Sequence, residues 1–492
     1  MLSSSIVFGQ SVDDTFAKDN MQKDLDVFKQ IRQQANSGLY KYRSKEQIDS
    51  SYHWAEQEIN TATSYIDFYN IICALTDFEG SVHNETGLSD KHQENLRKES
   101  YGYFPYPIKW IDGKWLINYE DGTIPLGSEI IKINGQPITE VIDHLGKYYT
   151  TDGQNLTGKR IGLQGSFSKF YRFYYGLQSV FEVTYRRSNS NTIEQETLTS
   201  VGYSDYYLHV GKMHSMSLDR LYYAELPDGL KYYYSQVDSS TGLLTINDFS
   251  MGNESTDSHK KYASFLDSVF TNIDSEKMEN LIVDVRINGG GDDPNDLVTY
   301  SYLTTREFQE SKEVWISFQK VPLLKYYDSP WPAFIRPFGV GKFNRQFRKR
   351  FPTEREEKYY ISKTENEMKV RAPNEKAFTG DIYLLISPAV ASAGSLFASM
   401  VAGNHNTTVI GEETMGGYYG HNGHTSLDYI LPKSKISISF FIDNIEQDVP
   451  IKENQIYGRG IIPDYEVRQT SEDFLNNADT QMNFVLKLIE QE

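Results

Sequence analysis

The sequence of 492 residues contains a single cysteine, Cys73. One cysteine excludes an intrachain disulfide and any zinc site built from several thiolates. Cys73 lies in the apolar run 71–75 (Ile-Ile-Cys-Ala-Leu), which is typical of a buried hydrophobic side chain rather than a nucleophile. Long hydrophobic runs are also absent, because no stretch approaches the roughly 18 apolar residues that span a membrane.

Positive charge is scarce. The chain has 49 Lys and Arg residues against 67 Asp and Glu residues, a formal net charge of −18. This balance excludes a general nucleic-acid binder, which needs a clustered basic surface, and disfavours binding to an anionic membrane. Hydrophobic residues make up 39% of the chain, as in a folded globular protein, and the length predicts about three domains at roughly 150 residues each.

The first residues lack the basic start and the long apolar core of a complete signal peptide. Residues 6–10 (Ile-Val-Phe-Gly-Gln) nevertheless resemble the end of one. We therefore interpret residues 1–12 as a candidate signal-peptide remnant and predict an exported protein, periplasmic or secreted. A frayed terminus without a targeting role is the alternative.

The rest of the chain up to residue 470 divides into three regions with different residue patterns. Residues 13–97 have apolar residues at helical spacing, such as Leu25, Phe28 and Ile31, with a break at residues 38–40 (Gly-Leu-Tyr). Residues 98–205 contain short strand signals separated by turns such as the Asp-Gly pairs at 112–113 and 121–122, and one helix over 139–148. The pattern predicts a helical domain followed by a β-rich domain.

In the third region, residues 206–470, the pattern predicts alternating strands and helices, which indicates a buried parallel sheet. The predicted strands are 243–246, 281–285 and 381–386, and the predicted helix between the first two is 259–273. Residues 305–375 are irregular, charged and aromatic, and we interpret them as an insertion or lid. Residues 471–492 are expected to form a C-terminal helix.

A glycine-rich loop, residues 286–291 (Arg-Ile-Asn-Gly-Gly-Gly), directly follows a predicted buried strand. Three glycines let a backbone approach a ligand closely with its N–H groups exposed. A phosphate loop is disfavoured because no Gly-Lys-Ser/Thr follows and three aspartates, Asp292, Asp293 and Asp296, would repel phosphate. The loop suits a transient oxyanion, with a plain turn as the alternative. Calcium binding by the aspartates lacks the spacing of an EF-hand.

A second segment, residues 387–395, joins the strand 381–386 to a predicted helix and carries Ser392 and Ser395. A serine at the start of a helix lies beside free backbone N–H groups and the positive end of the helix dipole. An acyl-transfer nucleophile benefits from that position. The alternative is a serine that only caps the helix.

Together these segments resemble the C-terminal-processing (tail-specific) serine protease family, which includes tricorn-core and retinoid-binding-protein relatives. The motifs that carry the resemblance occur in the family's order, at residues 281–291, 390–393, 411–417, 431–434 and 458–464. Residues 125–135 resemble the family's PDZ-like domain. The resemblance implies a multidomain α/β protein, in which an N-terminal helical domain and a PDZ-like β-rich domain precede a crotonase-like catalytic core built as a βαβ spiral.

The resemblance also implies roles for residues. Ser392 takes the position of the nucleophile, and the N–H groups of Ala393 and of Gly289 or Gly290 would form the oxyanion hole. The tail-specific branch uses a lysine as general base, but Gly417 occupies that position here, and no lysine lies between Ser392 and Lys433. The base must therefore come from another residue.

The tricorn-like branch, which this chain resembles more closely, takes a histidine from the N-terminal part as base. Here His83 in the segment 77–85 matches it, although Val82 separates the histidine from Ser81, whereas the branch has the serine directly before it. Glu453 is the best match for the branch's supporting glutamate. His421, just after the vacant lysine position, is the rival base. Histidine suits the task because its pKa lies near neutrality.

The sequence therefore predicts a serine peptidase that hydrolyses peptides or unfolded proteins through an acyl-enzyme on Ser392. The missing lysine supports one alternative, a non-catalytic protein that binds peptides or apolar ligands on the same fold. A weaker alternative is acyl-CoA chemistry, which the acidic charge and the PDZ-like segment disfavour. No metal or organic cofactor is implied, and the oligomeric state is left open.

Overall fold

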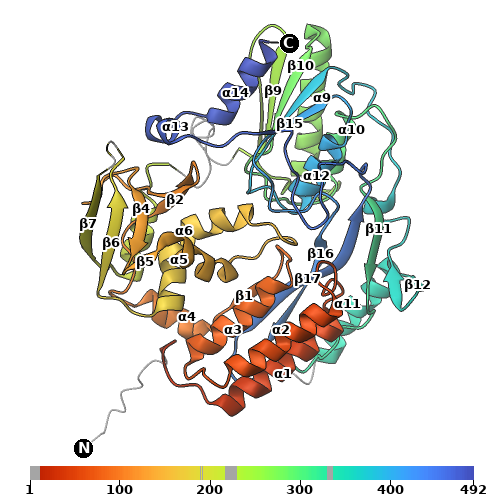
Figure 1. Ribbon diagram of the computed structural model, residues 1–492. Coiled ribbons are helices and arrows are strands. Elements are labelled where there is room, and N and C mark those ends of the chain that lie inside the picture. Colours follow the sequence, from red (N-terminus) through yellow and green to blue (C-terminus); the bar gives the residue numbers. More distant parts are fainter. Residues whose placement is uncertain (1–10, 189, 191, 216–229, 330–335, 492) are drawn as a thin grey trace, which may run out of the picture.

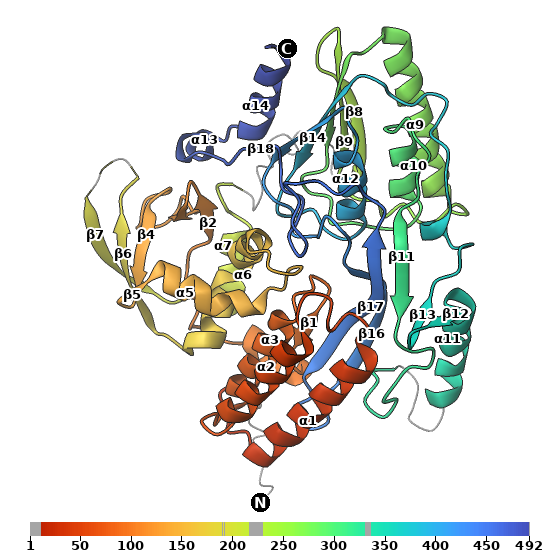
Figure 2. The ribbon, with the colours of Figure 1, turned by 45° about the vertical axis from the view of Figure 1, so that its right-hand side comes forward.

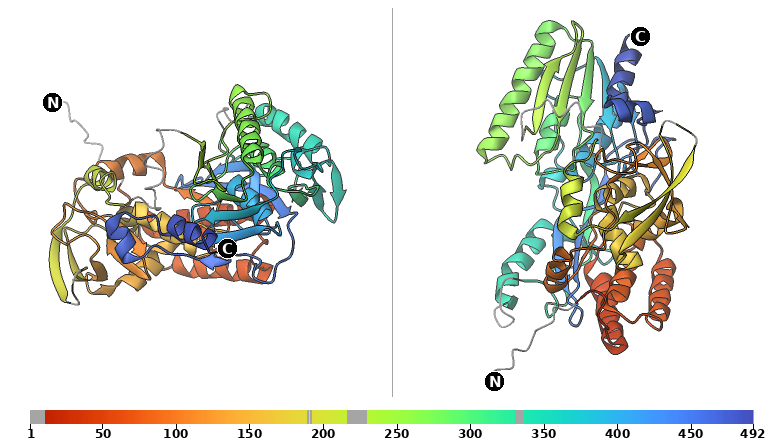
Figure 3. Two further views of the ribbon diagram at one scale, coloured as in Figure 1. Left: turned by 90° about the horizontal axis from the view of Figure 1, so that it is seen from above. Right: turned by 90° about the vertical axis from the view of Figure 1, so that its left-hand side faces the viewer.

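The computed structural model describes residues 11–188, 190, 192–215, 230–329 and 336–491. Residues 1–10, most of the candidate signal-peptide remnant, lie outside the described residues. Figure 3 shows that the parallel sheet with its helices lies at one end of the molecule and the N-terminal helices lie at the other.

The N-terminal part is helical, as expected. Its elements are α1 (Lys18–Ala35), α2 (Lys45–Glu58), α3 (Tyr65–Phe78), the short strand β1 (Glu85–Gly87) and α4 (Asp90–Arg97). Leu25, Phe28 and Ile31 lie on the buried face of α1, so their spacing was a correct indicator. Capping boxes that start at Ser44 and Ser64 satisfy backbone N–H groups at the beginnings of α2 and α3.

The next part contains a sheet in the order β2-β3-β4-β6-β7, with β5 beside β4. Its strands are β2 (Ile108–Ile111), β3 (Lys114–Ile117), β4 (Glu129–Ile133), β5 (Gln136–Pro137), β6 (Val180–Arg186) and β7 (Ile193–Thr199), with α5 (Ile138–Leu145) and η1 (Gly146–Tyr148) after β5. Asp112 and Gly113 both have positive φ, 51° and 78°, which forms the predicted hairpin turn. The Asp-Gly pair at 121–122 lies in a loop between β3 and β4 and makes no hairpin of its own.

The sequence interpretation missed the longest helix of this part, α6 (Thr157–Tyr175), where only strand signals were expected. Gly158, Gly162 and Gly165 lower its helix propensity, and its many aromatic residues favour strands. Burial overrides these preferences, because Phe167 and Tyr171 of this helix pack into the main hydrophobic core. A short helix, α7 (Tyr203–Val210), follows β7.

The predicted parallel sheet is present, in the order β18-β15-β14-β10-β9-β8. Its strands are β8 (Tyr232–Gln236), β9 (Thr241–Ile246), β10 (Asn280–Asp284), β14 (Asp381–Ile386), β15 (Thr407–Gly411) and β18 (Tyr465–Glu466), and its helices are α9 (Asp257–Glu276), α10 (Asn295–Ser301) and α12 (Ala393–Ala402). All neighbours are parallel except β8 and β9. Because β10 pairs directly with β14, the loops after these two strands meet at one edge of the sheet.

A third sheet contains strands from both the N-terminal and the C-terminal parts of the chain. It contains β1, β11 (Ser311–Ile316), β12 (Thr353–Arg355), β13 (Lys358–Tyr360), β16 (Asn422–Ile430) and β17 (Ser437–Gln447). The long β17 pairs with β1 of the helical part and with β11, and it runs from the N-terminal helices toward the parallel sheet (Figure 2).

The segment 305–375, interpreted from the sequence as an insertion or lid, is built into this sheet. It contributes β11, β12 and β13 together with α11 (Arg336–Arg350) and η2 (Asn366–Met368). Val314 and Ile316 of β11 are fully buried, so this strand is part of the core and not a covering flap. Four of its phenylalanines, Phe308, Phe318, Phe347 and Phe351, are buried as well, so much of the aromatic content that suggested a lid packs into the interior.

The C-terminal region forms two helices, α13 (Ser471–Asn476) and α14 (Thr480–Ile489), where one was expected. Asn477 ends the first in the left-handed conformation at φ 54°. Asp479 then caps the second by accepting a hydrogen bond from the N–H of Met482. The carboxylate of Asp479 also receives two bonds from Arg286, at 2.7 and 2.8 Å, which tie this region to the parallel sheet.

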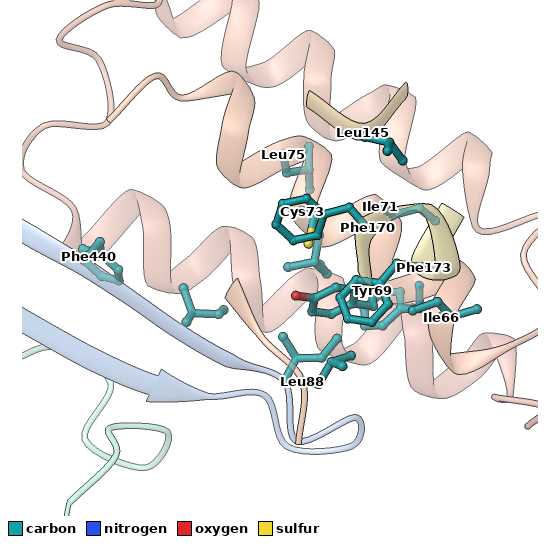
Figure 4. Packing of buried hydrophobic residues seen from close by; sticks show 14 of the residues in the cluster. Ile66, Tyr69, Ile71, Cys73, Leu75, Leu88, Leu145, Phe170, Phe173 and Phe440 are labelled. Atoms are coloured by element: carbon teal, nitrogen blue, oxygen red, sulfur yellow. The ribbon is translucent and has the colours of Figure 1, made fainter. Parts of the chain in front are cut away.

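Cys73 is buried in the main hydrophobic core among Ile71, Leu75 and Phe170 (Figure 4). Burial raises the pKa of its thiol to about 12, so the thiol is protonated and unreactive at neutral pH. Among the described residues, no helix is both long enough and apolar enough to cross a bilayer.

Candidate active site

Ser392 ends the loop after β14 and immediately precedes α12. Its backbone has φ 52° and ψ −134°, a conformation that L residues rarely adopt. Its side chain makes no capping hydrogen bond, whereas its carbonyl accepts bonds from the N–H groups of Ser395 and Leu396. The strained turn thus presents a hydroxyl that the helix does not use for capping.

The glycine-rich loop after β10 packs directly against this serine. A β-carbon on Gly290, which has φ 117°, would lie 2.7 Å from Cβ of Ser392 and 3.1 Å from N of Ala393. Gly291, at φ 146°, is held close to Phe249 in the same way. Only glycine permits these approaches, which explains two of the three consecutive glycines.

Asn288, fully buried, links the two loops. Its side chain donates to the carbonyl of Ile246 and accepts from the N–H of Gly290 at 2.9 Å, and its carbonyl accepts from the N–H of Ala391 at 3.3 Å. No role for Asn288 was expected from the sequence. Its position directly before three glycines was the signal available.

The hydrogen bond from the N–H of Gly290 to Asn288 affects which N–H groups can donate to an oxyanion. The N–H of Gly290 is engaged with Asn288, while the hydrogen bonds of the described residues include none from the N–H of Gly289 or of Ala393. A hydrogen bond to an oxyanion requires a free donor. Of the two glycines expected from the sequence, Gly289 is therefore the one whose N–H has no described hydrogen bond.

Ser392 and Ala393 line a cavity of about 610 Å³. His421, immediately before β16, and His424, near the beginning of β16, line the same cavity. His83 lies against its wall, with ring centroids 5.1 Å from His421 and 4.5 Å from Phe441, which also lines the cavity. The structure thus brings the serine and both candidate bases into one region.

The segment that carries His83 is fixed on both sides by buried polar contacts. Glu79 forms an ion pair with Arg32 of α1 and accepts a hydrogen bond from Asn84 at 2.9 Å. The N–H of Val82 donates to Asp152 at 3.0 Å. Buried, partnered charges of this kind specify one arrangement, because any other leaves a charge unpaired.

Both histidines are neutral at ordinary pH. Burial lowers the pKa of His83 to about 4, which a hydrogen bond with the backbone of Asn422 partly opposes. Burial lowers the pKa of His421 well below its usual range, with help from the nearby charges of His83 and His424. The Nδ1 atom of each ring is buried without a hydrogen-bond partner in the described part of the chain. A neutral imidazole is the form that can accept a proton.

Gly38, in the break between the first two helices, lies against Asn422. A β-carbon there would be 1.9 Å from the Asn422 amide nitrogen. The break that the sequence showed at residues 38–40 therefore lets the helical part approach β16 beside His421.

At Gly417, the position of the family lysine, the N–H donates to Asp152 at 3.1 Å. Asp152 thus connects this loop with Val82, and burial raises the pKa of its carboxyl to about 7. Lys41, half-buried, lies nearby and donates to Asn444 and to the carbonyl of Ile445, and desolvation of its ammonium group lowers its pKa to about 8. Neither residue had a signal in the sequence, because both reach this region from distant segments.

Glu453, the expected supporting carboxylate, lies exposed in a turn, and no described hydrogen bond joins it to His83 or His421. The structure therefore does not bring it to the histidines. The glutamate nearest the last motif in space is Glu413, which binds Arg459 and accepts from the N–H of Gly460 at 2.9 Å.

Residues 240–467 match the model of peptidase family S41, and residues 100–205 match the model of the PDZ domain. No curated protein matches the chain significantly.

Among solved structures, mature CPAF is 14% identical, with a TM-score of 0.60 over 94% of each chain. A complex of mature CPAF with lactacystin is 15% identical, with a TM-score of 0.59 over 96% of this chain and 97% of that one. At these identities the likeness concerns the fold, which is shared along nearly the whole length.

Proposed function

The chain belongs to peptidase family S41, and we propose that it hydrolyses peptide bonds through an acyl-enzyme formed on Ser392. Membership confirms the resemblance drawn from the ordered motifs and the predicted class of serine peptidase. The choice of the tricorn-like branch stays a prediction.

The observation that carries the proposal is the contact between the Ser392 turn and the glycine-rich loop. The hydroxyl of Ser392 makes no capping bond, and the N–H groups of Ala393, which follows it, and of Gly289, in the loop packed against it, donate no described hydrogen bond. As the hydroxyl attacks a carbonyl carbon, negative charge develops on the carbonyl oxygen, where two such donors stabilise it. Preorganised donors of this type contribute about 10²–10³-fold each to the rate.

In this mechanism a neutral histidine accepts the proton of the serine hydroxyl. The same histidine then donates a proton to the leaving amine. We assign this role to His83, with His421 as the alternative. His83 is supported by the family motif and by the anchored segment around it, and His421 by its place on the cavity wall. Glu453 has no part in this assignment, because it is exposed and not bonded to either ring.

The substrate class we propose is peptides or unfolded protein segments. The support is the PDZ domain, since domains of this kind bind extended chains by adding a strand to a sheet edge. The complex of CPAF with lactacystin describes what that relative binds, and lactacystin is a suitable first ligand to try here.

We also propose export from the cytoplasm. The apolar residues 6–8 followed by Gly9 and Gln10 support it. Cell fractionation and N-terminal sequencing of the mature protein test it, and an intact Met1 on protein confined to the cytoplasm would contradict it.

A fluorophosphonate probe tests the nucleophile. We expect the native protein to be labelled and Ser392→Ala to be unlabelled, because the probe reacts only with an activated hydroxyl. Ser395→Ala is the matched control, since the Ser395 side chain donates to the carbonyl of Ser392 and stays buried. Equal labelling of native protein and Ser392→Ala, or no cleavage of any peptide in a diverse library, would overturn the proposal and favour a binding protein.

A further inference from the structure

A cluster of buried acidic side chains adjoins the catalytic cavity and has no part in the mechanism above. Asp293 and Asp296 come from the end of the glycine-rich loop and the first turn of α10. Glu310 directly precedes β11, Glu367 lies in η2, and His424 lies in β16. Four segments that are distant in sequence thus converge on one point.

The side chains are close enough to share a ligand. One carboxylate oxygen from each of Asp293, Asp296 and Glu310 lies within 4.8 Å of the other two. A second set, made of Asp293, Glu367 and His424, meets the same limit. Asp293 belongs to both sets, so the two form a continuous site.

Two of these carboxylates are fully buried without a hydrogen bond. Asp296 and Glu310 are 0% exposed, and none of their four oxygens has a partner among the described residues. The N–H groups of Asp296 and Leu297 face the Asp296 carboxylate but lie outside hydrogen-bond geometry. The Nε2 atom of His424 is 4.0 Å from a carboxylate oxygen of Glu310, beyond hydrogen-bond distance. Unsatisfied buried oxygens of this kind call for an ion or a proton.

The surrounding positive charge does not balance the cluster. Arg350 pairs with Glu367 and with Asp443 at 3.2 Å, and Arg371 donates to the carbonyl of Asn366 at 2.7 Å. Two arginines therefore face the four carboxylates already named and Asp443. Burial and mutual repulsion raise the pKa of Asp296 and Glu310 well above the usual range, which expresses the same imbalance.

We propose that Asp293, Asp296 and Glu310 bind a divalent cation of the calcium type beside the catalytic cavity, with Glu367 and His424 at its edge. Carboxylate oxygens are the ligands that calcium prefers, and the three are mutually near enough for bonds of about 2.3–2.6 Å to one ion. A basic substrate side chain is a poorer occupant, because Asp296 and Glu310 are inaccessible from the cavity.

The cation would hold the glycine-rich loop in place. Asp293 and Asp296 follow Gly291 closely, whereas Glu310 directly precedes β11 of the third sheet, so one ion would join the oxyanion loop to that sheet. A bulge in β16 supports this arrangement: its pairing with β17 shifts between Gly423 and Ser426, and His424 there has φ 55° and is turned toward Asp293 at 3.7 Å.

The test is direct binding to the full-length chain after treatment with a chelator and its removal. Isothermal titration with CaCl₂ is expected to show one site, and calcium is expected to raise the thermal midpoint, because a ligand that binds only the folded state stabilises it. Luminescence of terbium, a calcium substitute, reports occupancy independently. These measurements need no activity, so their outcome is separate from that of the peptidase proposal.

The paired change Asp296→Asn with Glu310→Gln is expected to weaken calcium binding at least tenfold. Asp274→Asn with Glu276→Gln, at two exposed positions on α9, is the charge-matched control and should bind as the native chain does. Near-ultraviolet circular dichroism checks that each variant is folded. Absence of calcium and terbium binding by the native chain, or equal binding by native chain and folded double variant, would overturn the proposal and leave protons as the occupants.

Discussion

The two halves of the candidate active site are built in different ways. On the nucleophile side, backbone conformation positions the groups. Ser392, Gly290 and Gly291 have positive φ, and Asn288 links the two loops. On the base side, His83 and His421 are positioned by buried side chains from the N-terminal helices, the β-rich part and the third sheet. The first half depends on short local segments, and the second depends on long-range packing.

This difference explains how substitutions should act. On the nucleophile side, a change of a single glycine introduces a clash that the strand-loop-helix frame cannot absorb. On the base side, polar contacts such as that of Asp152 with Val82 and Gly417 carry the geometry, and their loss costs stability before it costs chemistry.

The largest expected effect is removal of the base. His83→Ala should lower kcat/KM by about 10²–10⁴-fold, the usual contribution of general-base catalysis. His421→Ala should have a smaller effect, and His53→Ala, at a side chain that is 70% exposed, is the control. Full activity of His83→Ala with inactive His421→Ala would transfer the role to His421.

The pH profile sharpens the same point. A base acts in its neutral form, so activity falls as the pH drops through its pKa. Because burial lowers the pKa of His83 to about 4, we expect kcat/KM of the native chain to stay level from neutrality to about pH 5 and to fall below it. An acid limb near the ordinary value of about 6.5 would contradict this environment for the base.

Gly290→Ala tests the nucleophile side and should reduce kcat/KM by about 10²–10³-fold, because the added carbon would meet Cβ of Ser392 and displace the oxyanion donors. Gly165→Ala, a helical glycine with open space around it, is the matched control and should raise stability by about 0.5–1 kcal/mol. Peptide hydrolysis and thermal unfolding measure both. Native activity in Gly290→Ala would show that the two loops are not packed as described.

Asp152→Asn tests the contact that joins the base segment to the Gly417 loop. The amide removes one of two acceptors, so the free energy of unfolding should fall by about 1–3 kcal/mol. The carboxyl pKa is raised to about 7, so its contribution to native stability is greatest at low pH and is lost as the pH rises through 7. The deficit of the variant should therefore be larger near pH 5 than near pH 8 in urea unfolding, and the reverse trend would contradict it.

The smallest effect concerns Cys73, in the hydrophobic core of the helical part. Its buried thiol, with a pKa of about 12, should not react with a thiol reagent in the native protein and should react fully after denaturation. Rapid reaction of the native protein would show that the core around α3 opens readily.

The same contrast determines what the sequence could predict. The strands at 281–285 and 381–386, the glycine-rich loop and the Ser392 turn were readable because hydrophobic runs, glycines and small residues mark them locally. Asp152, Lys41 and Glu310 carried no mark, because their roles arise where distant segments meet. Helix α6 was missed because aromatic residues with strand preference become helical when packing demands it. Glu453 was chosen by its place near a motif, which says nothing of its exposure.

The pairing of β1 with β17 has a consequence for how the protein is made. A ribosome adds about 5–20 residues per second, so the N-terminal helices emerge long before Ser437–Ser439, the partners of Glu85–Gly87. Until then, β1 next to His83 has no strand to pair with, and His83 and Ser392 stay apart. The topology therefore keeps a partly synthesised peptidase from hydrolysing itself. Its N-terminal helices can form early, but the candidate active site cannot assemble until the later strands have been made.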